Sequence, residues 1–157
     1  MSKKIFIACD TNKTSVVKKI IKYTNTKKLK IGYKFGLEFI NSKNGRSFIS
    51  KIKNKIIFAD LKLHDIPNTC SSAVKAIKDL KINYLTIHIS AGLEALKATK
   101  KVSGSIKLVG VTTLTSIDNT SLKQIGYDKK LKNLVIHQAK LANKAKLDAI
   151  VCSAHEV

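Results

Sequence analysis

Short apolar runs alternate with segments of helical period along this chain of 157 residues. The apolar runs have the length of buried strands and lie at Ile5–Cys9, Leu29–Tyr33, Lys55–Leu61, Tyr84–Ile89, Ile106–Thr112 and Ala149–Cys152. Apolar residues three or four apart predict helices at 16–21, Phe35–Ile40, Phe48–Ile52, 74–80, Leu93–Lys100 and Leu131–Lys146. Continuous apolar strands separated by helices favour a parallel sheet that is buried on both faces.

Polar residues ahead of two of these helices are expected to cap them. Asn12 or Thr14 stands at the start of the first helix, and Thr69 precedes the helix that carries Val74. Such side chains accept hydrogen bonds from the free N–H groups at a helix N-terminus.

The strand-helix unit repeats roughly every 25–30 residues, which fits either a doubly wound sheet or a (β/α)8 barrel. No Gly-x-Gly-x-x-Gly follows the first strand, so a dinucleotide-binding sheet is unsupported. Polar residues instead follow several strands, as at the mouth of a barrel: Asp10, Lys30, Asp60 with Lys62, His88, 112–116 and 153–156. We therefore expect an α/β fold, a (β/α)8 TIM barrel.

The predicted units are too few for a closed barrel, which has eight units and usually about 250 residues. The expected architecture is a TIM barrel truncated to about six βα units, with residues 1–157 as a single partial domain that lacks the last two units. On this interpretation the chain is the first part of a longer protein, and its unpaired parallel edges make it prone to aggregation.

The composition excludes several other classes of protein. Hydrophobic residues make up 44% of the chain, enough for a real core. No apolar run approaches the roughly 20 residues of a membrane span, and the apolar stretch near the N-terminus is too short for a secretory signal. The cysteines, Cys9, Cys70 and Cys152, are odd in number and form no Cys-x-x-Cys pair. We expect a cytoplasmic protein with reduced thiols and no membrane partner.

The net charge of +20 raises the question of nucleic-acid binding. All 30 basic residues except Arg46 are lysines, and they are spread along the whole chain. Nucleic-acid surfaces favour arginine, which contacts phosphate and guanine through two hydrogen bonds. We interpret the charge as a genome-wide codon bias and expect no nucleic-acid partner.

The segment from Asp60 to Asp65 carries the strongest chemical signal. Side chains two apart on a strand point the same way, so Asp60 and Lys62 are expected to project together, with Asp65 on the following loop. Pro67, the only proline, stiffens that loop. Charges on a buried strand are costly unless they are paired, so this array favours a functional site over an ordinary salt-bridged strand end.

The stretch Asp60-Leu-Lys-Leu-His-Asp-Ile-Pro-Asn-Thr69 resembles the signature of the orotidine 5'-phosphate decarboxylase family. Further matching segments follow in order along the whole chain: Ala8–Asp10, Lys30–Gly32, Leu85–His88, Gly110–Ser116, Gln124–Tyr127 and Val151–Glu156. Ala154 departs from a proline that is common at that position in the family.

The resemblance implies decarboxylation of orotidine 5'-phosphate to UMP in pyrimidine biosynthesis, with no cofactor and no metal. Lys62 would stabilise the developing carbanion and deliver the proton, and Asp60 would lie beside the departing carboxylate. The implied catalytic residues are Lys30, Asp60, Lys62 and Asp65, and the implied substrate-binding residues are Asp10, Lys30, Thr69 and Ser116. The resemblance also implies a homodimer in which Asp65 and Thr69 cross to the neighbouring site.

Two alternatives stay open at this point. A related, metal-dependent branch contains 3-keto-gulonate-phosphate decarboxylases and hexulose-phosphate synthases; it places a Glu in the second strand, where this sequence is assigned Lys30. A non-catalytic barrel remnant is the other. His88 either joins the charged network or packs as a barrel histidine. The family's phosphate-gripping residues come from late elements, so we expect little activity from residues 1–157 alone.

Overall fold

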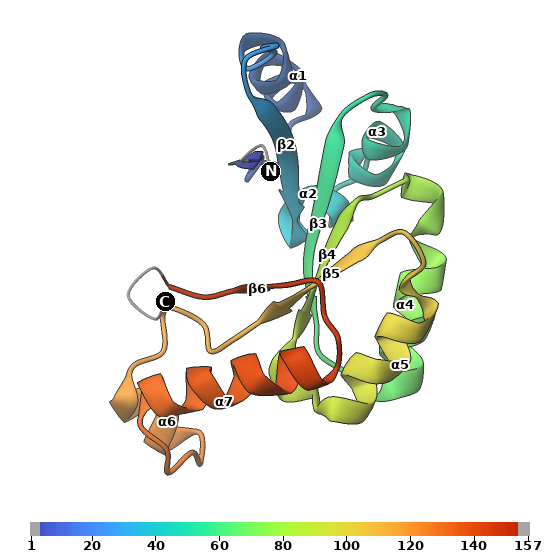
Figure 1. Ribbon diagram of the computed structural model, residues 1–157. Helices are drawn as coiled ribbons and strands as arrows, with labels where there is room; N and C mark the ends of the chain where they lie inside the picture. The colour runs from blue at the N-terminus through green and yellow to red at the C-terminus, as the bar shows by residue number, and fades with distance from the viewer. Residues whose placement is uncertain (1–3, 154–157) are drawn as a thin grey trace. The chain divides into compact units, whose positions relative to one another are not determined.

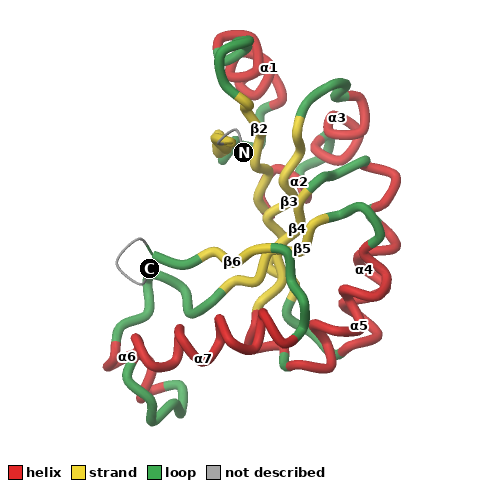
Figure 2. Tube along the Cα trace, viewed as in Figure 1, coloured by secondary structure: helices red, strands yellow, loops and turns green. Residues whose placement is uncertain are grey.

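The computed structural model describes residues 4–153. Ala154–Glu156, part of the polar group predicted after the sixth strand, lie outside the described residues. Across residues 4–153 strands alternate with helices (Figures 1 and 2), and the strands form one sheet in the order β1-β2-β3-β4-β5-β6. The pairs β1–β2, β2–β3 and β5–β6 are parallel. The predicted alternation is therefore correct.

The chain divides into two compact units, Met1–Leu61 with Ala76–Leu85, and Lys62–Lys75 with Thr86–Val157. The boundaries cross strands β3 and β4, so each strand contributes residues to both units. That residues 1–157 form a single partial domain stays a prediction.

The first unit contains the early strands and the helices that follow them. Its elements are β1 (Lys4–Ala8), α1 (Thr14–Tyr23), β2 (Lys30–Gly36), α2 (Leu37–Asn41), α3 (Gly45–Lys51), most of β3 (Ile56–Leu63), a 3-10 turn η1 (Lys78–Leu80) and the start of β4 (Tyr84–His88). Aromatic rings pack edge to face in its interior, with Phe6 5.1 Å from both Phe58 and Tyr84.

Strand β2 is longer than the sequence predicts. It continues through Phe35 and Gly36, which the periodicity assigned to a helix, and α2 begins only at Leu37. Phe35 is fully buried and its ring lies 4.9 Å from that of Phe39. This packing stabilises an extended conformation at a position that local periodicity could not distinguish from a helix.

The second unit contains the end of β3 and the later elements. These are α4 (Pro67–Ala76, whose last residue belongs to the first unit), a 3-10 turn η2 (Ile89–Ala91), α5 (Leu93–Ser103), β5 (Lys107–Val111), α6 (Asn119–Gln124), α7 (Leu131–Lys144) and β6 (Ala149–Val151). Its core is aliphatic and groups Cys70, Ile87, Ile89, Leu96, Ala142 and Ala145. Helix α6 was not predicted; Asp118 caps it by accepting a hydrogen bond from the Ser121 N–H.

Both predicted helix caps are wrong. Helix α1 begins at Thr14 after Lys13, whose side chain makes no capping hydrogen bond. Helix α4 begins at Pro67, so Thr69 lies within its first turn. Proline suits the first helical position because its missing N–H would have no partner there.

Candidate functional site

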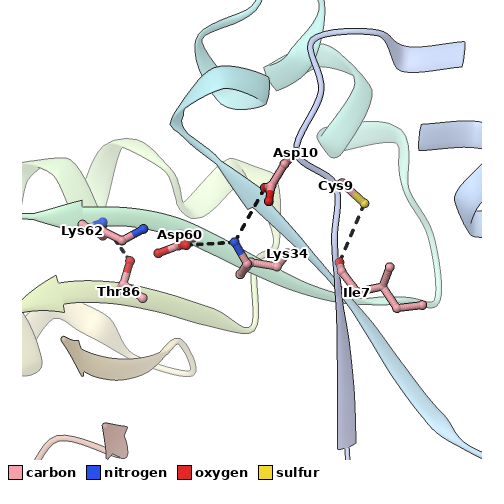
Figure 3. Close-up of polar contacts among 7 residues, drawn as sticks. All are labelled: Ile7, Cys9, Asp10, Lys34, Asp60, Lys62 and Thr86. Carbon is pink, nitrogen blue, oxygen red and sulfur yellow. Dashed lines mark hydrogen bonds and ion pairs between the residues drawn. The ribbon is translucent and has the colours of Figure 1, made fainter. Parts of the chain in front are cut away.

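Three charged side chains meet at the carboxyl ends of β1, β2 and β3 in the first unit. The Lys34 ammonium donates to Asp60 Oδ2 at 3.0 Å and lies 3.8 Å from Asp10 Oδ1. Figure 3 shows the lysine Nζ between the two carboxylates. Asp60 is 8% exposed, so its charge is compensated by an ammonium rather than by bulk water.

Regular strand pairing produces this cluster. Lys34 lies opposite Ala8 on one side and Phe58 on the other, and Gly36 lies opposite Asp60. The Cys9 N–H donates to the Lys34 carbonyl at 2.8 Å, which places Asp10 immediately beyond the end of β1. Neighbouring parallel strands therefore bring the three charges to the same edge.

Lys30, the predicted catalytic lysine of the second strand, is not part of this cluster. It is the first residue of β2, is exposed, and lies opposite Lys4. Lys34 lies four residues further along the strand, a distance of about 13 Å between the two Cα atoms. The structure brings Lys34 to the two carboxylates, and not Lys30, because Lys34 lies near the carboxyl end of β2 and Lys30 at its amino end.

The thiol beside this cluster is not poised to react. Burial, and then the charge of Asp10, raise the pKa of Cys9 to about 11, although Lys34 acts in the opposite direction. Cys9 is fully buried and its Sγ lies 3.9 Å from the Ile7 carbonyl oxygen (Figure 3). The protonated form prevails at neutral pH, and the thiolate is the nucleophilic form.

The second unit supplies Lys62, which adopts a left-handed backbone conformation with φ of 48°. Its N–H donates to Thr86 Oγ1 at 2.8 Å, as drawn in Figure 3. The alternation of a regular strand therefore ends at Lys62, and the predicted reason for Asp60 and Lys62 pointing the same way does not apply there. The chain itself keeps their Cα atoms within about 7 Å.

The loop after β3 and the first turn of α4 place Asp65 and Thr69 on the surface of the second unit. Residues 64–69 are all exposed, and Ile66 between them is 65% exposed. Asp65 Oδ1 accepts from the Ile66 N–H at 2.7 Å, and its carbonyl accepts from the buried Cys70 thiol at 3.3 Å. The hydrogen bond from the buried Cys70 thiol thus holds the backbone of this segment, while the side chains of residues 64–69 stay exposed.

Ser116 lies in an exposed turn after β5, where the Ile117 N–H donates to the Leu114 carbonyl. A cavity of about 240 Å³ in this unit is lined by His64, His88, Ser90, Thr112, Thr113, Leu114, Ile117, Leu122, Ile125, Tyr127, Leu134 and Gln138. The rings of His88 and His64 lie 5.2 Å apart. His88 therefore faces a histidine neighbour in the second unit.

Sequence reasoning missed two residues of this region, Lys34 and Thr86. Lys34 belongs to a second Lys-x-Gly triplet, four residues after the first. Knowing that β2 extends to Gly36 would have favoured Lys34 over Lys30. Thr86 lies on a buried strand as an ordinary β-branched residue, and no sequence signal marks its hydrogen bond.

A metal-binding cluster and a membrane-spanning helix are both absent from the described residues, 4–153. Nowhere in that range do three or more His, Cys, Asp or Glu side chains gather in a way that could hold a metal ion. None of the helices in the same range has the length and apolar character needed to cross a membrane.

Comparison with known sequences identifies related proteins. Residues 3–157 match the family described as orotidine 5'-phosphate decarboxylase / HUMPS. An orotidine 5'-phosphate decarboxylase of Wolbachia from Brugia malayi is 43% identical over 148 residues, which are 91% of this chain and 65% of the relative. The enzyme of that name from Ehrlichia canis is 48% identical over 79% of this chain and 56% of its own length. The chain thus spans about two thirds or less of these relatives.

Solved structures confirm the predicted fold class. The orotidine 5'-phosphate decarboxylase of Lactobacillus acidophilus matches with a TM-score of 0.89 and 30% identity, over 99% of this chain and 73% of that one. The enzyme of Methanocaldococcus jannaschii, solved with the inhibitor BMP, matches with a TM-score of 0.76 and 25% identity, over 97% and 68%. The described residues therefore contain the first six strands of the barrel fold, five of them followed by helices.

Proposed function

Since the chain belongs to the orotidine 5'-phosphate decarboxylase / HUMPS family, we propose that it decarboxylates orotidine 5'-phosphate to UMP. The observation that carries the proposal is the Lys34 ammonium between Asp10 and Asp60, with Lys62 following on the same strand as Asp60. The reaction needs charged groups beside a departing carboxylate and a proton donor beside the carbon that loses it. In this proposal the cluster provides the charged groups and Lys62 the proton donor.

Lys62 and Asp60 have the central roles in the proposed reaction. The bond between the pyrimidine carbon and the carboxylate breaks, CO2 leaves, and the electron pair stays on the ring carbon. The Lys62 ammonium stabilises that negative charge and transfers a proton to it. The Asp60 carboxylate, held by Lys34 at 3.0 Å, repels the substrate carboxylate in the ground state.

Lys34 replaces Lys30 in this proposal. Lys34 and Asp10 are assigned to the ribose hydroxyls, since Asp10 is two-thirds exposed and lies within 3.8 Å of the ammonium. Ser116, exposed after β5, is assigned to the pyrimidine amide edge. No step requires a metal or an organic cofactor.

The proposed partner is a second copy of the chain. The segment from Asp65 to Thr69 is exposed, including the apolar Ile66, as is expected of a segment that reaches into a neighbouring site. Ile66→Lys is expected to shift the protein from dimer to monomer in sedimentation, whereas Ile125→Lys, at a similarly exposed apolar residue, leaves it unchanged. A parent protein that sediments as a monomer would contradict the dimer.

The free thiols of Cys9, Cys70 and Cys152 suit a cytoplasmic location.

The activity is tested by following UMP formation from orotidine 5'-phosphate. Two forms are assayed: the chain, and a fusion in which the last third of the Wolbachia relative follows residue 157. Lys62→Ala in each form is the matched control. Turnover that depends on Lys62 in either form supports the proposal, and a well-folded fusion without turnover overturns it.

Treatment with EDTA separates the two branches of the family. A divalent cation beside Asp60 would be repelled by the Lys34 ammonium, which lies 3.0 Å from the carboxylate. Turnover is therefore expected to survive EDTA unchanged. Loss of turnover that added Mg2+ restores would favour the metal-dependent branch.

A further inference from the structure

The backbone at Lys62 is exceptional among the described residues. Asn54, Lys81 and Lys146 also have positive φ values, but Asn54 precedes a strand and the two lysines follow the ends of η1 and α7, where left-handed residues are common. Lys62 alone among them lies within a strand, β3, and the strand continues to Leu63. Within a strand, a lysine holds this conformation only when tertiary contacts stabilise it.

Thr86 provides one such constraint. It lies on β4, is 1% exposed, and its Oγ1 accepts the Lys62 N–H at 2.8 Å (Figure 3). A side-chain oxygen here does what a backbone carbonyl does in a regular ladder. A buried N–H without an acceptor is costly, so this bond favours the irregular conformation over an extended one.

We propose that Thr86 is a positioning residue for Lys62: its hydroxyl fixes the left-handed backbone that sets the direction of the lysine side chain. This inference rests on the proposed function, in which Lys62 delivers the proton. Proton transfer requires the donor within hydrogen-bond reach of the reacting carbon, and a displacement of about 1 Å can lower the rate about a hundredfold. Thr86 acts through Lys62 and not on the substrate.

The test compares variants at Thr86 with a matched control at Thr99. Thr86→Val keeps the shape of the side chain and removes the acceptor, Thr86→Ala removes the acceptor without adding a methyl group, and Thr86→Ser keeps the hydroxyl. Thr99 is also fully buried in this unit, but its hydroxyl donates to the Ala95 carbonyl within α5 at 2.7 Å. Thr99→Val therefore repeats the chemical change away from Lys62.

Kinetics of the active form give the first measurement. Thr86→Val and Thr86→Ala are expected to lower kcat at least tenfold while KM changes less than twofold, and Thr86→Ser to stay within threefold of the parent. Thr99→Val should leave kcat unchanged. Equal losses in Thr86→Val and Thr99→Val, or an unchanged kcat in both acceptor-free variants, would overturn the positioning role.

Amide hydrogen exchange at Lys62, followed by NMR, gives a second measurement that needs no turnover. Removing the acceptor is expected to speed exchange of the Lys62 N–H at least tenfold, with no change in Thr99→Val. Unchanged exchange would overturn the anchoring role of Thr86. A parent protein without turnover would instead overturn the proposed function and the catalytic part of this inference, while exchange still decides whether Thr86 holds the backbone.

Discussion

The two compact units hold the two lysines of the proposed site by different means. In the first unit, Lys34 leaves a regular strand and is fixed by the two carboxylates that it contacts. In the second unit, Lys62 is fixed through its own backbone, which departs from the strand and bonds to Thr86. The position of the Lys34 ammonium therefore depends on its charged partners. The position of Lys62 depends instead on a buried, uncharged neighbour, Thr86.

The same contrast extends to the peripheral ion pairs. Arg46 and Asp79 in the first unit pair at the surface, with side chains 47% and 60% exposed. Lys100 and Asp148 in the second unit are less exposed, and Asp148 Oδ2 also accepts the Leu108 N–H at 2.8 Å. The carboxylate of the second pair therefore also binds a backbone N–H of β5.

Lys62→Ala is expected to have the largest effect. Removal of the proton donor should lower kcat about 1,000-fold, within the range of general acid catalysis. The fold should persist because the Lys62 N–H still donates to Thr86, which circular dichroism and urea titration can verify. Turnover within tenfold of the parent would show that Lys62 is not the proton donor.

The two lysines of β2 provide the next test, because Lys34→Ala and Lys30→Ala make the same change at opposite ends of one strand. Lys34→Ala should lower kcat about 100-fold, comparable to the loss of one electrostatic contact in an active site. Lys30→Ala should change kcat less than about twofold, as is usual for a surface substitution. Steady-state assays of both variants decide between them, and the reverse ranking would restore the lysine that the sequence predicted.

The choice between Lys30 and Lys34 shows what the sequence can and cannot provide. Asp60, Lys62 and Asp65 lie in one contiguous motif, so they could be found without knowing which strands are neighbours. Choosing between the triplets Lys30-Ile-Gly and Lys34-Phe-Gly required knowing at which residue β2 ends. The two glycines differ physically: a Cβ at Gly32 would lie 2.6 Å from the Phe6 ring, so that glycine serves packing, whereas a Cβ at Gly36 would meet only Asp10 Oδ1, at 3.8 Å.

The strand-helix alternation and the fold class could be predicted because buried parallel strands are apolar along their whole length. Helix boundaries and the left-handed Lys62 could not. Phe35 is strand because its ring packs against Phe39, and φ at Lys62 depends on a hydroxyl 24 residues later in the chain. Tertiary contacts, which local patterns do not contain, decide both.

Asp148→Asn tests the less exposed pair in this comparison. Burial alone would raise the pKa of Asp148, but the hydrogen bonds from Lys100 and the Leu108 N–H, with nearby lysine charges, lower it below its usual value. A carboxyl with a lowered folded-state pKa stabilises the protein above its unfolded pKa and loses that contribution as pH falls through the folded value. The variant should cost about 1 kcal/mol at pH 7, less than the roughly 1.5–3 kcal/mol of hydrogen bonds to charged groups, because the Asp148 side chain is 29% exposed and solvent screens its charge.

Urea titrations of parent and Asp148→Asn at pH 7 and at pH 3 measure this contribution. The difference between the two proteins should shrink at the lower pH, because the Asp148 carboxyl of the unfolded parent takes up a proton below its ordinary pKa of about 3.9, so that ionisation favours the folded state less. A difference that stays constant between the two pH values would assign the cost to the amide's altered hydrogen bonding rather than to the charge.

Asp79→Asn is expected to have the smallest effect of the four. The Arg46 guanidinium lies 2.6 Å from Asp79 Oδ1, but it also donates to the Ala76 carbonyl at 2.7 Å, so it keeps a partner when the carboxylate is lost. Exposed ion pairs contribute about 0.2–1 kcal/mol and are screened by salt. The loss in urea titration at pH 7 should therefore be at most half of that for Asp148→Asn and should vanish in about 1 M NaCl, where the screening length is about 3 Å. A larger, salt-insensitive loss would mean that the surface pair of the first unit is as strongly coupled to its backbone as the pair of the second unit, and the contrast between them would fail.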